Sequence, residues 1–150
     1  MYQNSFVHHF TKVLVDIMFY GGILCCLAIP FATPVLARMI GYSQDVVLPY
    51  IIILLLSGLC ALFILWQLKA MFKTLLGGNP FVAANVTSLR KCSVASLLIA
   101  LIYLVKILFW FTIASSIIVI IFSLLGLFCL TLKDIFKQAV AYKEESDWTV

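Results

Sequence analysis

Charged residues are scarce in this chain. Only 11% of its 150 residues are Asp, Glu, Lys or Arg, whereas about a quarter of the residues in soluble domains are charged. Apolar residues make up 65%. A water-soluble fold of this length needs more polar side chains to cover its surface, so the composition excludes one. The surface of the folded chain must therefore face the hydrocarbon of a bilayer.

The sequence also lacks the motifs of metal-dependent and nucleophilic enzymes. It contains no HExxH, no GxSxG and no glycine-rich phosphate loop, and its five cysteines form no CxxC pair. His8 and His9 are adjacent, so on a helix they point about 100° apart and cannot chelate one metal ion. We therefore predict no enzyme activity, no cofactor and no metal site. The net charge of +4 includes no long basic run, so direct nucleic-acid binding is not expected.

Long apolar stretches predict an all-α fold, a four-helix transmembrane bundle. A helix needs about 20 mostly apolar residues to cross a hydrocarbon core of about 30 Å. The first stretch, about residues 13–34, ends in a segment where Pro30 and Pro34 remove amide donors, and we expect the helix to fray there. The second covers about residues 46–68 and has Pro49 in its first turn, a position that tolerates proline.

The last apolar stretch is too long for one span. A continuous helix over residues 93–132 would be about twice as long as the hydrocarbon core is thick, so the chain must fold back. We expect the turn within residues 109–116, because the Trp, Thr and Ser side chains there suit a membrane interface. This gives a third span at about residues 91–110 and a fourth at about residues 114–133.

The basic residues predict the orientation in the membrane. The link between the second and third spans, residues 69–90, contains Lys69, Lys73 and Arg90 and no acidic residue. Short cytoplasmic loops are enriched in Lys and Arg, so this link is expected to be cytoplasmic. With four spans, both termini are then cytoplasmic as well.

Two segments are expected to continue beyond the spans. The spacing of apolar residues extends the second helix through residues 69–76 and the fourth into a cytoplasmic tail, residues 134–150. Residues 77–80, Gly-Gly-Asn-Pro, predict a tight turn, since glycine permits positive φ and proline disfavours helix in the residue before it. Asn85 or Thr87 can cap the helix that follows. The acidic end of the tail either docks on the basic link or is a solvated, frayed end.

Each of these two segments carries a recognisable motif. One is a Gly-x-Pro-Phe turn followed by an Asn and a Leu-Arg pair: Gly78, Pro80, Phe81, Asn85, Leu89 and Arg90. The other is Phe-x-x-Ala followed by an acidic end: Phe136, Ala139, Lys143, Glu144, Glu145, Asp147, Thr149 and Val150. Together with the four spans, they resemble a bacterial membrane family catalogued as domain of unknown function number 2975. The resemblance covers nearly the whole chain and implies a location in the bacterial inner membrane. It also implies that a helix-turn-helix transcription regulator is often encoded nearby, while no biochemical activity is established for the family.

Two ionisable residues lie inside the predicted spans. A charge at the centre of a bilayer costs about 3 kcal/mol or more, so such residues are functional candidates. Asp16 lies near the inner end of the first span and is expected to meet Lys12, one helical turn earlier. Lys106 lies near the outer end of the third span and is expected to snorkel to the outer headgroups. At these depths the two are too far apart to pair.

Three hypotheses for function come from these features. The first is a regulatory or interaction protein whose cytoplasmic face binds a partner such as a helix-turn-helix regulator. Its candidate contact residues are Gly78, Pro80, Phe81, Asn85, Arg90, Phe136, Glu144, Glu145 and Asp147. The second is a small transporter or channel built as a homo-oligomer, in which Asp16 and Lys106 are the residues to test. The third is a membrane enzyme, and it lacks any candidate constellation.

Overall fold

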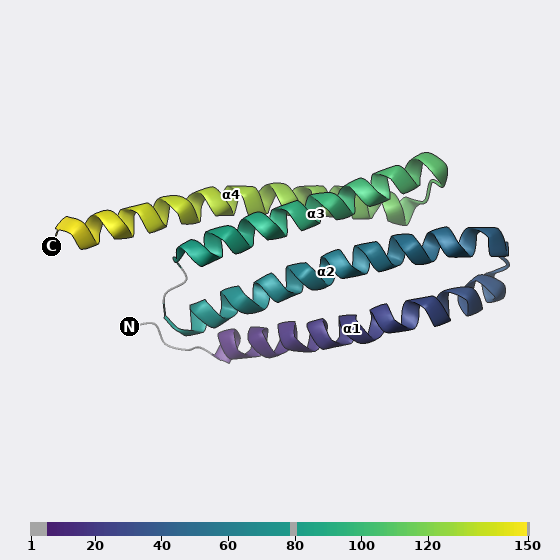
Figure 1. The fold of residues 1–150 in the computed structure, drawn as a ribbon, viewed down its shortest axis with the longest axis horizontal. Coiled ribbons are helices and arrows are strands. Elements are labelled where there is room, and N and C mark those ends of the chain that lie inside the picture. Colours follow the sequence, from purple (N-terminus) through teal and green to yellow (C-terminus); the bar gives the residue numbers. More distant parts are fainter. Residues whose placement is uncertain (1–5, 79–80, 150) are drawn as a thin grey trace.

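Four long helices and one short 3-10 helix make up the described part of the protein (Figure 1). The computed structural model describes residues 6–78 and 81–149, apart from the side chains of residues 76 and 147–149. The elements are α1 (Phe6–Ile40), η1 (Gln44–Val46), α2 (Val47–Leu76), α3 (Ala83–Phe109) and α4 (Ile113–Thr149). Each of the four long helices is long and apolar enough to cross a membrane. The prediction of an all-α protein with several membrane spans is confirmed.

The helices lie side by side in chain order, each antiparallel to the one before it (Figure 1). Among the described residues, α1 packs on α2, α2 on α3 and α3 on α4, and no other two of these long helices are in contact. The start of α1, the link between α2 and α3, and the end of α4 therefore lie at one end of the bundle, which we call the terminal end. The α1–α2 and α3–α4 links lie at the opposite end.

The first helix continues through both of its prolines. The expectation that it frays between Pro30 and Pro34 is wrong, because α1 ends only at Ile40. There Gly41 has a φ of 88° and its amide donates to the Ala37 carbonyl at 3.0 Å. In hydrocarbon, every unwound residue would leave its own amide and carbonyl unpaired. A continuous helix that lacks only the two proline amides is therefore the better arrangement.

The link between α2 and α3 has the predicted positive φ but not the predicted cap. α2 runs without interruption to Leu76, and Gly78 then has a φ of 96°. α3 begins at Ala83 with Val82 in the N-cap position, and no side-chain hydrogen bond caps it. The proposal that Asn85 or Thr87 caps this helix is therefore wrong.

The opposite end has a side-chain cap instead. α3 ends at Phe109 and α4 begins at Ile113, so the chain turns within the predicted stretch of residues 109–116. The Ser115 amide donates to Thr112 Oγ1 at 3.2 Å, which satisfies one of the free amides at the start of α4.

Small side chains form the interface between α3 and α4. α3 buries Ser93, Ser96 and Ala100, and α4 places Gly126 against this face. A Cβ atom built on Gly126 would lie 3.4 Å from the Ser93 carbonyl oxygen, so the two backbones approach closely there. Close approach between small residues is a main source of helix association in membranes, where the hydrophobic effect contributes little.

Candidate functional site

The two sequence motifs meet at the terminal end of the bundle. The rings of Phe81 and Phe136 lie 5.2 Å apart between centroids, with an angle of 57° between their planes. Phe81 follows the α2–α3 link and Phe136 lies on α4, so the contact ties the link to the last helix. Pro80 lies outside the described residues, and so does the side chain of Asp147.

Asn85 is buried between helices. Only 2% of it is exposed, and its Nδ2 donates to Thr74 Oγ1 at 2.7 Å. The Thr74 hydroxyl in turn donates to the Met71 carbonyl at 2.7 Å. Asn85 thus joins the start of α3 to the end of α2.

Three basic residues surround one pocket between α3 and α4. The pocket has a volume of about 370 Å³, and Arg90, Lys133 and Lys137 line it together with the Thr87 hydroxyl. Arg90 was among the predicted contact residues, whereas Lys133 and Lys137 were not. Their spacing of i and i+4, which places them on one face of α4, was the signal that could have found them.

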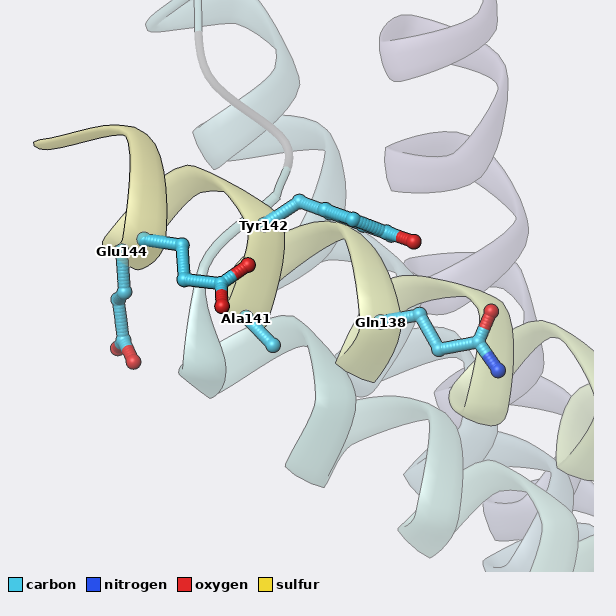
Figure 2. Close-up of a pocket in the computed structure, with 5 residues that line it drawn as sticks. Gln138, Ala141, Tyr142 and Glu144 are labelled. Atoms are coloured by element: carbon cyan, nitrogen blue, oxygen red, sulfur yellow. The ribbon is translucent and has the colours of Figure 1, made fainter. Parts of the chain in front are cut away.

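The C-terminal part of α4 carries the acidic candidates. It is helical as far as Thr149, so it is not a frayed end. Glu144 and Glu145 are exposed, and Tyr142 is 72% exposed. These side chains, with Gln138, project from consecutive turns of α4 and line a shallow hollow of about 710 Å³ (Figure 2). Within the described residues, no ion pair joins this acidic segment to the basic link.

Asp16 pairs with a residue of the neighbouring helix. Lys69 Nζ lies 3.4 Å from Asp16 Oδ1, and the two side chains are 29% and 33% exposed. The same ammonium group lies over the rings of Phe19 and Tyr20, at 4.8 and 5.1 Å from their centroids. The expected partner, Lys12, is not the one that the structure shows. The pair joins α1 to α2 because Lys69 is on the face of α2 that meets α1.

Lys106 turns into the bundle instead of snorkelling outward. Only 6% of it is exposed. Its Nζ donates to Ser115 Oγ at 2.6 Å and to Thr112 Oγ1 at 3.3 Å, and it lies 5.0 Å from the centre of the Tyr50 ring. The expectation that Lys106 reaches the outer headgroups is therefore wrong. The hydroxyl groups of the α3–α4 turn supply the acceptors that the ammonium group would otherwise find among the headgroups.

The two intramembrane charges lie at different ends. Asp16 is joined to Lys69 in the half of the bundle nearest the terminal end, and Lys106 lies beside the α3–α4 turn at the opposite end. In the part of the chain that the structure describes, no group of three His, Cys, Asp or Glu side chains converges.

Comparison with known proteins identifies a family without an assigned activity. The family described as "Protein of unknown function (DUF2975)" matches residues 7–150. No curated protein and no solved structure matches the chain.

Proposed function

Because this chain belongs to the DUF2975 family of unknown function, we propose its role from its site: a small bacterial inner-membrane protein that regulates by binding a cytoplasmic partner. The partner binds the terminal end of the bundle. A helix-turn-helix transcription regulator is the kind of partner that the family resemblance suggests.

The exposed end of α4 carries this proposal. The Phe81–Phe136 contact lies where the link meets α4, and α4 continues well beyond it (Figure 1). All residues from 141 to 146 are exposed. Residues 141–149 extend the helix by about 13 Å. Short isolated helices are marginal in water, so a projecting segment of this kind gains stability when a partner covers it.

The distribution of basic residues favours a cytoplasmic location for this end. Of the ten Lys and Arg residues, all except Arg38 and Lys106 lie toward the terminal end. Cytoplasmic segments near membrane spans are enriched in Lys and Arg. This distribution supports a cytoplasmic location for the two termini and for the α2–α3 link.

The chemistry of the projecting helix indicates a basic partner surface. Tyr142 offers a large exposed ring, and tyrosine is among the residues that contribute most to protein interfaces. Glu144 and Glu145 add two carboxylates next to it. DNA-binding proteins carry a basic surface for phosphate contacts. An acidic helix bound to that surface would compete with DNA and hold the regulator at the membrane.

The test is whether the projecting helix retains a regulator at the membrane. Cells express the full chain, a variant with Glu144→Lys and Glu145→Lys, or a Tyr142→Ala variant, and proteins recovered with each are identified by mass spectrometry. We expect the full chain to recover a helix-turn-helix protein in the membrane fraction. Both variants should release that protein to the soluble fraction.

An Asp45→Lys variant is the matched control. Asp45 is exposed in η1 at the opposite end of the bundle, so this change also reverses a surface charge but leaves the proposed contact intact. Recovery of the same regulator by all variants, or of none by the full chain, would contradict the proposal.

A transporter or channel has less support. Asp16 already has a cationic partner and Lys106 already has two hydroxyl acceptors, at different ends of the bundle. A pathway formed by several copies predicts that Asp16→Asn or Lys106→Met changes solute flux in proteoliposomes that contain the full chain.

A further inference from the structure

A basic pocket and an apolar groove join on one face of the bundle. The basic pocket is the one lined by Thr87, Arg90, Lys133 and Lys137, between α3 and α4. The groove has a volume of about 520 Å³ and runs along the seam between α2 and α3. Thr87 and Arg90 line both, so the pocket and the groove adjoin along α3.

The basic pocket has little to neutralise it. No carboxylate lines it. Among the described side chains, the acid within ion-pair distance of these cations is Asp134, 3.7 Å from Lys133, and the Asp134 side chain is 69% exposed. Lys91, beside Arg90, adds a further positive charge at the mouth of the groove. Arg90 and Lys137 therefore have no carboxylate within ion-pair distance among the described side chains, and Lys133 has only a largely exposed one.

The groove is suited to hydrocarbon. Leu59 and Phe63 of α2 face Val94 and Leu98 of α3 along it, and its lining is almost entirely apolar. On α3 it extends from Thr87 to Leu98, about 16 Å along the helix axis, which is close to the thickness of one leaflet of the hydrocarbon core. A single acyl chain has the width and the chemistry to fill such a groove.

The depth of the pocket matches the phosphate layer of a membrane. Trp110 lies at the opposite end of α3, and tryptophan is enriched where the membrane meets water. Arg90 is about 30 Å from Trp110 along the helix axis, the thickness of the hydrocarbon core. With Trp110 at one interface, the guanidinium group of Arg90 lies at the other.

We propose that this pocket and groove form a binding site for an anionic phospholipid of the leaflet at the terminal end. The Arg90 guanidinium binds the phosphate through paired hydrogen bonds, and the ammonium groups of Lys133 and Lys137 add charge. One acyl chain lies along the groove between α2 and α3. Basic pockets between membrane helices are typical binding sites for anionic headgroups. The site is separate from the projecting end of α4, so it does not depend on the proposed protein partner.

The experiment measures lipid binding to the full chain in detergent by native mass spectrometry. The probes are dioleoyl phosphatidylglycerol, dioleoyl phosphatidylcholine and inorganic phosphate. We expect the unmodified protein to bind phosphatidylglycerol at least tenfold more tightly than phosphatidylcholine. Each basic residue near a membrane surface contributes about a fivefold change in affinity, so Arg90→Gln with Lys137→Gln should weaken phosphatidylglycerol binding by about 25-fold.

Matched variants separate the pocket from general charge. Lys12→Gln with Lys73→Gln removes two exposed cations toward the same end but outside the pocket, and it should leave lipid binding unchanged. Arg90→Lys keeps the charge but loses the paired hydrogen bonds, so it should bind phosphatidylglycerol more tightly than Arg90→Gln and less tightly than the unmodified protein, an order that a variant which merely fails to fold would not give. Val94→Trp fills the groove and should weaken phosphatidylglycerol binding.

Several results would overturn the proposal. Equal affinity for the two lipids would remove the preference for a negative charge. An equal loss in the control pair would show that total charge is responsible. Competition by inorganic phosphate at the concentration of the lipid, with no effect of Val94→Trp, would indicate a simple anion site. Glu144→Lys with Glu145→Lys should leave lipid binding intact, so failure of the protein-partner proposal does not affect this one.

Discussion

Adding one methyl group at Gly126 should weaken the packing of α4 on α3. A Cβ built there lies 2.8 Å from both Cγ and Cδ2 of Leu97, and 3.4 Å from the Ser93 carbonyl oxygen. Contacts of 2.8 Å between carbon atoms do not occur without movement, and Cγ is not the free end of the leucine side chain. Gly126→Ala therefore forces the two helices apart or drives Leu97 into another rotamer, at a cost of about 1–3 kcal/mol.

A second glycine provides the reference for this cost. Alanine is more favourable than glycine inside a helix by about 1 kcal/mol, so the net loss for Gly126→Ala alone is only about 0–2 kcal/mol. Gly21, in α1, has nothing within 4 Å of a built Cβ. Gly21→Ala should therefore gain the higher helix propensity of alanine without any steric clash. The difference in unfolding free energy between the two variants isolates the packing term, about 1–3 kcal/mol.

The assay is unfolding of the full chain from dodecyl maltoside micelles by increasing dodecyl sulfate, followed by circular dichroism and tryptophan fluorescence. A Leu97→Ala change in the Gly126→Ala background should recover part of the loss, since it removes the atoms that the new methyl group meets. If Gly126→Ala and Gly21→Ala unfold with the same free energy, or if Leu97→Ala adds its full cost in both backgrounds, the close approach of α3 and α4 is refuted.

Three further predictions concern the polar groups. Lys69→Met should lower the unfolding free energy by about 1 kcal/mol and weaken cysteine cross-linking between α1 and α2, because it leaves Asp16 without its cation; unchanged cross-linking would contradict this. Lys106→Met should be neutral or stabilising by up to about 3 kcal/mol in the same unfolding assay, because it removes a buried charge that has no carboxylate partner among the described residues. Ser115→Ala should instead destabilise, because it leaves the ammonium group short of an acceptor, and the reverse order of these two variants would refute the argument. Asn85→Leu should speed proteolysis at the α2–α3 link through loss of the Thr74 hydrogen bond, and an unchanged cleavage rate would count against that role.

Some features of the site follow from sequence patterns that act locally. Gly78 takes a positive φ because glycine does so without a steric cost, and α2 continues to Leu76 because its apolar spacing stays helical. Phe81 and Phe136 were both chosen from motif spacing, and the structure brings their rings together. From the sequence, one could anticipate only that the two segments lie at the same end of the bundle. The ring contact itself could not be predicted.

Other features were missed because they depend on which helices are neighbours. The predicted partner for Asp16 was on its own helix, but the ammonium group that reaches it comes from α2. Lys106 was predicted to reach the headgroups because it lies near the outer end of its span. The turn after α3 instead brings two hydroxyl groups to its ammonium group. The small residues of α3 lie on its buried face. Their spacing could have predicted which face of α3 packs against another helix, whereas hydrophobicity alone could not, because all faces of a membrane helix are apolar.

The sequence by itself determined that the chain consists of membrane-spanning helices, since backbone groups in hydrocarbon must be paired within each segment and long apolar runs satisfy that condition locally. It also determined that the helices alternate in direction, because consecutive spans of one chain must cross the bilayer in opposite directions. Only the tertiary structure decided how each helix is rotated about its axis and which neighbour it touches. Those choices come from side-chain packing between residues far apart in sequence, and they bring Arg90 to Lys133, Asp16 to Lys69 and Ser93 to Gly126.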